Sequence, residues 1–250
     1  MGWSHIAIVV GTAAASGTTV NASSSLSVDE NDLLVASFHW QGAAAGDTIT
    51  IDQSDGTDAF TNIANTKTVE GFDLGTGMAY LIVAGADAAF TPRFTLSAAG
   101  IERDILVRQF RPDSGDTVTL DTSNGSSGNG TALSSGVVTT TGTDEVVVGC
   151  GGQGNGTSLT SEQINSVAAD AATDSASVYY NNWYRILTAT FAGGQATETA
   201  GGAANSWGCA IACFKSVGAG GPSAGTDTAT AGLTESLNTV SVTLSIQESG

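Results

Sequence analysis

Short runs of apolar and β-branched residues, separated by acidic, small or glycine-rich turns, form the main pattern along this chain. In Val28–Trp40, acidic and amide residues that favour a turn precede a continuous run of apolar and aromatic residues. Thr140–Cys150 repeats this phrase about a hundred residues later. We expect these two segments to supply the central strands of a two-layer β-sandwich.

The remaining pattern also favours strands, because no stretch of about a dozen residues keeps the 3.6-residue apolar period of a helix. Further strands are predicted at Trp3–Val10, Gly77–Ala84, Ile101–Phe110 and Asn205–Val217. Asn124–Gly130, by contrast, consists only of Asn, Gly and Ser, and it is predicted to be a mobile loop. The expected fold class is therefore all-β, an antiparallel two-layer sandwich of jelly-roll type.

The composition changes near the C-terminus, which divides the chain into three predicted parts. These are a sandwich domain over residues 1–217, a Gly/Ala/Thr-rich linker over 218–232, and an extended strand arm over 233–250. The arm alternates polar residues with four apolar ones, namely Val240, Val242, Leu244 and Ile246. A single strand cannot build its own core, so it must fold back on the sandwich or add to a neighbouring subunit's sheet. We favour the second alternative, with these four residues as the subunit contact.

The charge narrows the range of partners. The chain has 250 residues and a formal net charge of −17, which argues against binding to nucleic acid or to anionic membranes. Its three cysteines are too few for a disulfide framework, and we expect them to be small buried hydrophobic residues. The first ten residues lack the positive region of a signal peptide, so assembly without classical secretion is expected.

No catalytic motif is present, and the chain is predicted not to be an enzyme and to need no cofactor. Its histidines, His5 and His39, stand in strand-like segments, and no nucleophile elbow, zinc motif or phosphate loop accompanies them. The sequence leaves open one enzymatic alternative, a pair of carboxylates that hydrolyses glycosides, because such a pair is recognised by its separation in space and not along the chain.

Three groups of residues are candidates for ligand contacts. The first group is Asp52, Asp55 and Asp58, which stand three residues apart. Calcium loops place their carboxylates at alternate positions, so a solvated turn is favoured here over a Ca²⁺ site. The second group is a cluster of arginines, for which pairing with carboxylates is favoured over an anionic ligand; it comprises Arg103, Arg108 and Arg111. The third is an aromatic cluster that packs inside the sandwich or stacks on sugar rings; it comprises Tyr179, Tyr180, Trp183 and Tyr184.

Val28–Val35, with its acidic turn and Leu-Leu-Val strand, and Thr141–Gly149 resemble passages in jelly-roll β-sandwich proteins of tailed bacteriophage particles. The closing passages Ala229–Leu237 and Val240–Ser245 are similar to repeats in phage structural proteins. This resemblance implies a virion structural protein, as a capsid decoration, head-fibre or minor tail component. It would be assembled in the host cytoplasm as a homo-oligomer that contacts other virion proteins. The alternative is a carbohydrate-binding module that uses the aromatic cluster to hold a glycan.

Overall fold

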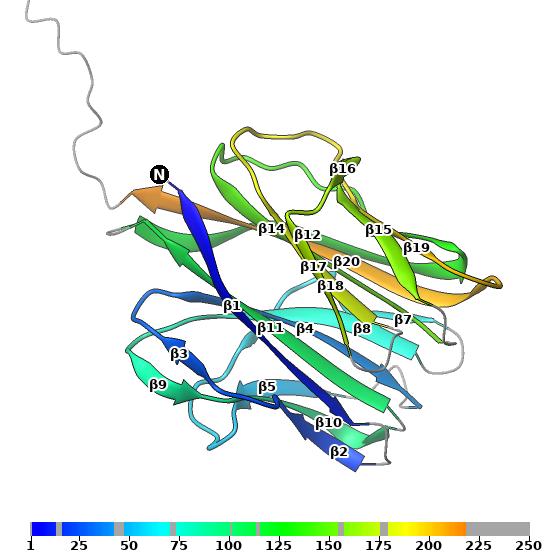
Figure 1. Ribbon diagram of the computed structural model, residues 1–250, viewed down its shortest axis with the longest axis horizontal. Coiled ribbons are helices and arrows are strands. Elements are labelled where there is room, and N and C mark those ends of the chain that lie inside the picture. The colour runs from blue at the N-terminus through cyan, green and yellow to red at the C-terminus, as the bar shows by residue number, and fades with distance from the viewer. Residues whose placement is uncertain are drawn as a thin grey trace, which may run out of the picture. The chain divides into compact units, whose positions relative to one another are not determined.

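A computed structural model describes residues 2–13, 17–42, 48–70, 74–100, 102–113, 116–154, 158–175 and 180–218 of the protein. Every regular element in these ranges is a β-strand, and the strands pair in antiparallel fashion (Figure 1). The expected all-β antiparallel sandwich fold is therefore confirmed. The predicted linker beyond Gly218 and the predicted arm, including Val240–Ile246, lie outside the described residues.

The first half of the chain forms one sandwich. We call its larger sheet the first inner sheet, which in pairing order contains β1 (Trp3–Ala13), β11 (Glu102–Pro112), β4 (Leu33–Gln41), β8 (Leu74–Ile82) and β6 (Thr61–Asn62), with β7 (Thr68–Glu70) also on β8. The first outer sheet contains β2 (Gly17–Asn21), β10 (Pro92–Gly100) and β5 (Ile49–Gln53). A short ribbon joins β3 (Leu26–Val28) to β9 (Asp87–Phe90).

The second half of the chain forms another sandwich. Its inner sheet contains β12 (Asp116–Gly130), β20 (Asn205–Gly218), β14 (Glu145–Gln153), β18 (Tyr180–Ile186) and β17 (Ala171–Asp174). Its outer sheet contains β13 (Ala132–Ser134), β19 (Ala196–Ala200), β15 (Leu159–Ile164) and β16 (Val167–Ala168).

The two sandwiches have the same strand order. In the first inner sheet β1 pairs with β11, and β11 pairs with β4. In the second inner sheet β12 pairs with β20, and β20 pairs with β14. β4 and β14 are the strands of the two acidic-turn phrases. The chain alternates between inner and outer sheets, as in a jelly roll. The two phrases found in the sequence are thus central strands, and each belongs to its own sandwich.

Apolar side chains fill three layers, one inside each sandwich and one between the two inner sheets. On β4, Leu34 and Phe38 belong to the first sandwich's own core, whereas Leu33 and Val35 pack between the inner sheets. The opposing face comes from the second inner sheet, with residues such as Phe214. Strands covered on both faces are apolar throughout instead of alternating, which explains the continuous runs in the sequence.

Many glycines lie inside strands and face an aromatic ring on the neighbouring strand. Trp40 is paired with Gly75, and a Cβ atom on Gly75 would lie 2.0 Å from Cζ2 of that indole. Gly149 is paired with Trp183 in the same way, and a Cβ atom on Gly149 would lie 2.6 Å from Cε2 of Trp183. The large ring lies over the backbone of the glycine, so each pair fills the volume of two ordinary side chains.

The predicted mobile loop at Asn124–Gly130 is wrong, because this segment is the second half of β12. Each residue from Asn124 to Gly130 pairs with β20 between Asn205 and Ile211. The small residues are required by close packing: a Cβ atom on Gly125 would lie 2.7 Å from the main-chain oxygen of Asn65. Main-chain hydrogen bonds supply the stability that the small side chains do not.

The pairing of Gly149 with Trp183 predicts that Gly149→Ala destabilises the protein by about 1–3 kcal/mol, because the buried indole has no room to move. Urea unfolding should show a lowered midpoint. Gly85→Ala is the matched control, since no atom lies within 4 Å of the added methyl group. Equal midpoints for the two variants would contradict the packing role of Gly149.

Candidate functional site

The aromatic cluster of β18 lies inside the protein. Tyr180, Trp183 and Tyr184 are 0%, 0% and 9% exposed. The two tyrosines pack between the inner sheets, and Trp183 packs against the second outer sheet. Because β18 is covered on both faces, these three residues form no surface on which a sugar ring could stack. Tyr179 lies outside the described residues.

A polar cluster between the inner sheets is centred on Arg108 of β11, which is 1% exposed. Its guanidinium donates from Nε to the side-chain oxygen of Asn182 and from Nη2 to the main-chain oxygen of Asn182, the latter at 2.9 Å. It also donates to Thr173 Oγ1 at 3.1 Å and lies 4.9 Å from the ring centroid of Tyr184. Arg108 therefore joins the first sandwich to β17 and β18 of the second.

His5 completes this cluster as an acceptor. Its Nε2 lies 3.2 Å from Nη1 of Arg108, and its ring stacks on Tyr184 with centroids 4.6 Å apart. Since the guanidinium has only donors, Nε2 must accept, and the imidazole must be neutral. Burial and the charge of Arg108 lower the pKa of His5 to about 4. In the part of the chain that the structure describes, no carboxylate forms an ion pair with Arg108, and burial lowers its pKa to about 10.

A second polar pair lies further along the same interface. His39 Nδ1 is 3.2 Å from Asp104 Oδ2, and both residues are 0% exposed. The imidazole of His39 stacks on Tyr180 with centroids 5.4 Å apart. Ser37 links this pair's strand to the Arg108 cluster by accepting a 2.7 Å hydrogen bond from Asn182 Nδ2. A carboxylate that orients an imidazole is an arrangement used by general bases, but here both groups are enclosed between two sheets.

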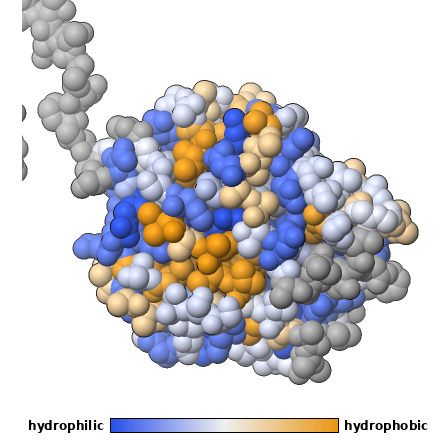
Figure 2. Space-filling model, viewed as in Figure 1, coloured by the Kyte–Doolittle hydropathy of each residue, from blue (hydrophilic) through white to orange (hydrophobic). Residues whose placement is uncertain are grey.

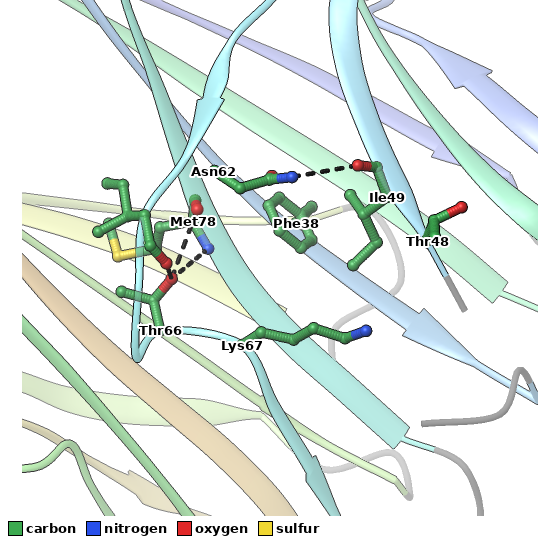
Figure 3. A pocket seen from close by; sticks show the side chains of 8 residues that line it. Phe38, Thr48, Ile49, Asn62, Thr66, Lys67 and Met78 are labelled. Carbon is green, nitrogen blue, oxygen red and sulfur yellow. Dashed lines mark hydrogen bonds between the residues drawn. The ribbon is translucent and has the colours of Figure 1, made fainter. Parts of the chain in front are cut away.

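The first sandwich contains a pocket of about 430 Å³ that is lined by residues on or next to β4, β5, β6, β7 and β8 (Figure 3). Eight residues line it: Phe38, Thr48, Ile49, Asn62, Ile63, Thr66, Lys67 and Met78. Phe38, which is 2% exposed, forms the buried floor, and in Figure 3 its ring lies between Asn62 and Lys67. The amide of Asn62 donates to the Ile49 carbonyl at 3.1 Å, and Nζ of Lys67 lies 5.7 Å from the Trp40 ring centroid. An apolar floor with a polar rim is typical of small-molecule sites.

The three aspartates of the predicted turn do not converge on one point. Asp52 receives two hydrogen bonds from Arg93, at 2.8 and 2.7 Å, so its carboxylate is already neutralised. Asp55 accepts from Thr57 within the turn, at 3.0 Å from the main chain and 2.7 Å from the hydroxyl, and these bonds lower its pKa. In the described parts of the chain, no group of three or more His, Cys, Asp or Glu residues is arranged to hold a metal ion.

The arginine cluster of the sequence is divided by the sheet. Arg108 faces the second sandwich, whereas Arg103 is on the opposite face of β11 and donates to the Gly17 carbonyl at 2.6 Å. Arg111 makes the expected carboxylate pairs, with Asp29 at 2.6 Å and Asp32 at 2.7 Å. The expectation for cysteines is confirmed, since all three are free and buried.

Comparison with known proteins gives no family. No protein-family model matches this chain, and neither the curated proteins nor the solved structures contain a match. Among the described residues no helix is long and apolar enough to span a membrane.

Reasoning from the sequence missed the polar cluster. The signal was Asn181-Asn182, an amide pair inside an otherwise aromatic strand. A buried amide in a strand needs hydrogen-bond partners, and Asn182 finds them in Arg108 and Ser37. The partners themselves could not be identified, because they come from strands 74 and 145 residues away.

The role of Asn182 predicts that Asn182→Leu destabilises the protein by about 2–3 kcal/mol, because the buried Nε donor of Arg108 loses its side-chain acceptor. Adding Arg108→Met should recover a large part of that loss, since both sides of the contact are then apolar. Urea midpoints of the two single variants and the double variant measure this coupling. Additive losses would contradict a direct contact.

The His5 contact predicts a pH dependence. The folded pKa of about 4 lies below the ordinary value of 6.5, so the unfolded chain binds more protons between these pH values. The contribution of neutral His5 to the free energy of unfolding should therefore be fully present above pH 6.5, and it should be lost as the pH drops towards 4. In His5→Gln the side-chain oxygen still accepts from Arg108 but does not titrate. The difference in unfolding free energy between wild type and His5→Gln should change in this window, and parallel curves would contradict the assignment.

Proposed function

We propose that this chain is a non-enzymatic structural protein of a tailed bacteriophage virion, serving as a capsid decoration, head-fibre or minor tail component. The observation that carries the proposal is the pair of jelly-roll sandwiches joined through a buried face. Jelly rolls build viral capsids and also lectins, so the fold supports the proposal by analogy alone. The resemblance of the acidic-turn strands to phage sandwich proteins points in the same direction.

Assembly through sheet contacts gives this proposal a physical route. β1 and β12 are edge strands of the two inner sheets, and an edge strand offers main-chain donors and acceptors to another chain. β20 ends at Gly218, opposite Asp116 at the start of β12, and it ends near the N-terminus (Figure 1). The sequence that follows carries the alternating polar and apolar pattern of Val240–Ile246, which predicts a strand suited to add to a neighbour's sheet.

A carbohydrate-binding module is the second candidate, and the pocket beside Phe38 is the observation that favours it. Its aromatic floor and its amide, hydroxyl and ammonium rim, contributed by Asn62, Thr48 and Lys67, are groups that hold sugars. Such a module would use this pocket, because the aromatic residues of β18 are buried.

The assembly proposal predicts that the apolar face of the arm controls oligomerisation. The full-length chain should form a defined oligomer in light scattering, and Val242→Asp with Leu244→Asp should reduce it to a monomer. Ser241→Asp with Ser245→Asp adds the same charge to the polar face and should leave the oligomer intact. In phage particles produced with each protein, only wild type and this control should be incorporated.

A monomeric wild type, or equal behaviour of the two double variants, would contradict assembly through the arm. Glycan binding that is lost in Asn62→Ala, with the oligomeric state unchanged, would favour the second candidate.

A further inference from the structure

Three charged side chains form a row across neighbouring strands of the second inner sheet. Lys215 stands on β20, directly opposite Glu145 of β14. On the other side of β20, Asp121 stands at the β-bulge of β12, where the register shifts between Leu120 and Thr122. A bulge re-aims the side chain of the extra residue, and here Asp121 reaches Lys215 diagonally.

The amine and the carboxyl of this row are in contact. Lys215 Nζ lies 2.8 Å from Asp121 Oδ1 and 2.8 Å from Thr141 Oγ1. The side chain of Asp121 is 3% exposed and that of Lys215 is 31% exposed. Thr141 fixes the carboxyl further, because its main-chain N–H donates to Asp121 Oδ2 at 2.7 Å. The amine is thus hydrogen-bonded to an oxygen attached to Cγ, the atom that it would attack, and the carboxyl is held in place.

Glu145 is placed to move a proton between them. It is 0% exposed, and its Oε1 accepts from the Gly142 N–H at 2.6 Å. Its Oε2 is also buried, and the Glu145 carboxyl is close enough to Asp121 for the two side chains to interact. Burial, followed by the neighbouring Asp121, raises the pKa of Glu145 to about 7. A carboxyl with such a pKa both takes up and releases a proton near neutral pH.

We propose that Lys215 and Asp121 react to form an intramolecular amide, with Glu145 as the proton relay. The ammonium first gives a proton to Asp121 through Glu145, which leaves a neutral amine and a neutral carboxylic acid. The Nζ lone pair then attacks Cγ of Asp121, a C–N bond forms, and the C–O bond to the hydroxyl breaks. The second amine proton leaves with that oxygen as water, so nothing is oxidised or reduced.

The hydrogen bond between the two groups raises the pKa of Lys215 and, together with those from Thr141, lowers the pKa of Asp121 against the effect of its burial, so the ion pair is the resting state and the reaction passes through the neutral form. Two features of the site assist that step. Asp121 and Glu145 are enclosed, which weakens the solvation that normally stabilises separate charges. Lys215 also borders a surface hollow of about 290 Å³, lined in part by Thr143 and Val217, through which water can leave. The amide would bind the edge strand β12 covalently to β20, the last described strand of the chain.

The test is the intact mass of the full-length protein. The wild-type mass should be lower than that of the sequence by one water molecule, and a tryptic digest should yield a branched peptide joining Asp121 to Lys215, without cleavage after Lys215. Lys215→Arg should keep its full mass. Glu145→Gln, which preserves the shape of the relay, should fold with an unchanged circular dichroism spectrum and retain the full mass.

Asp121→Asn provides an independent variant, because attack on its carboxamide releases ammonia and leaves the same cross-linked product. Its final mass should therefore equal that of the reacted wild type. A folded wild-type protein with the full mass of its sequence and ordinary cleavage after Lys215 would overturn the proposal. This test does not depend on the virion role, because it needs no oligomer or particle.

Discussion

The buried face between the two inner sheets is the contact on which the rest of the structure depends. Leu33, Val35, Val146 and Val148, which line it from both sides, are all 0% exposed. Separating the sandwiches would expose these rows to water at a cost of roughly 25 cal/mol for each Å² of apolar surface. Each inner sheet is also covered by an outer sheet, so its strands are buried on both faces. The two halves therefore form one folding unit.

Polar contacts fix how the two sheets meet. An apolar face alone permits sliding, whereas Arg108 is satisfied only when Asn182, Thr173 and His5 are all in place. Burying a guanidinium without a carboxylate is costly unless its donors are matched. The cluster therefore acts mainly on register, and the apolar layers supply most of the stability.

The sequence predicted an antiparallel β-sandwich of two layers, whereas each half of the chain forms its own sandwich. The acidic turn and the apolar run of Val28–Trp40 predicted a central strand, because a continuous apolar run can be recognised from the sequence without knowledge of the strand's neighbours. The packing role of glycines such as Gly149 is not visible in the sequence, because their aromatic partners stand on other strands. Asn124–Gly130 was assigned to a loop, since its main-chain bonds leave no trace in the side-chain pattern. The Asp121, Glu145 and Lys215 row was invisible for the same reason: only pairing between strands brings it together.

Calorimetry of the full-length protein tests most directly whether the two sandwiches share one core. If they do, heating should give a single transition, with equal calorimetric and van't Hoff enthalpies, at neutral pH. The same transition should be seen in circular dichroism and in tryptophan fluorescence, which reports on Trp40 of the first sandwich and Trp183 of the second. Two separate transitions, one for each half of the chain, would contradict the account.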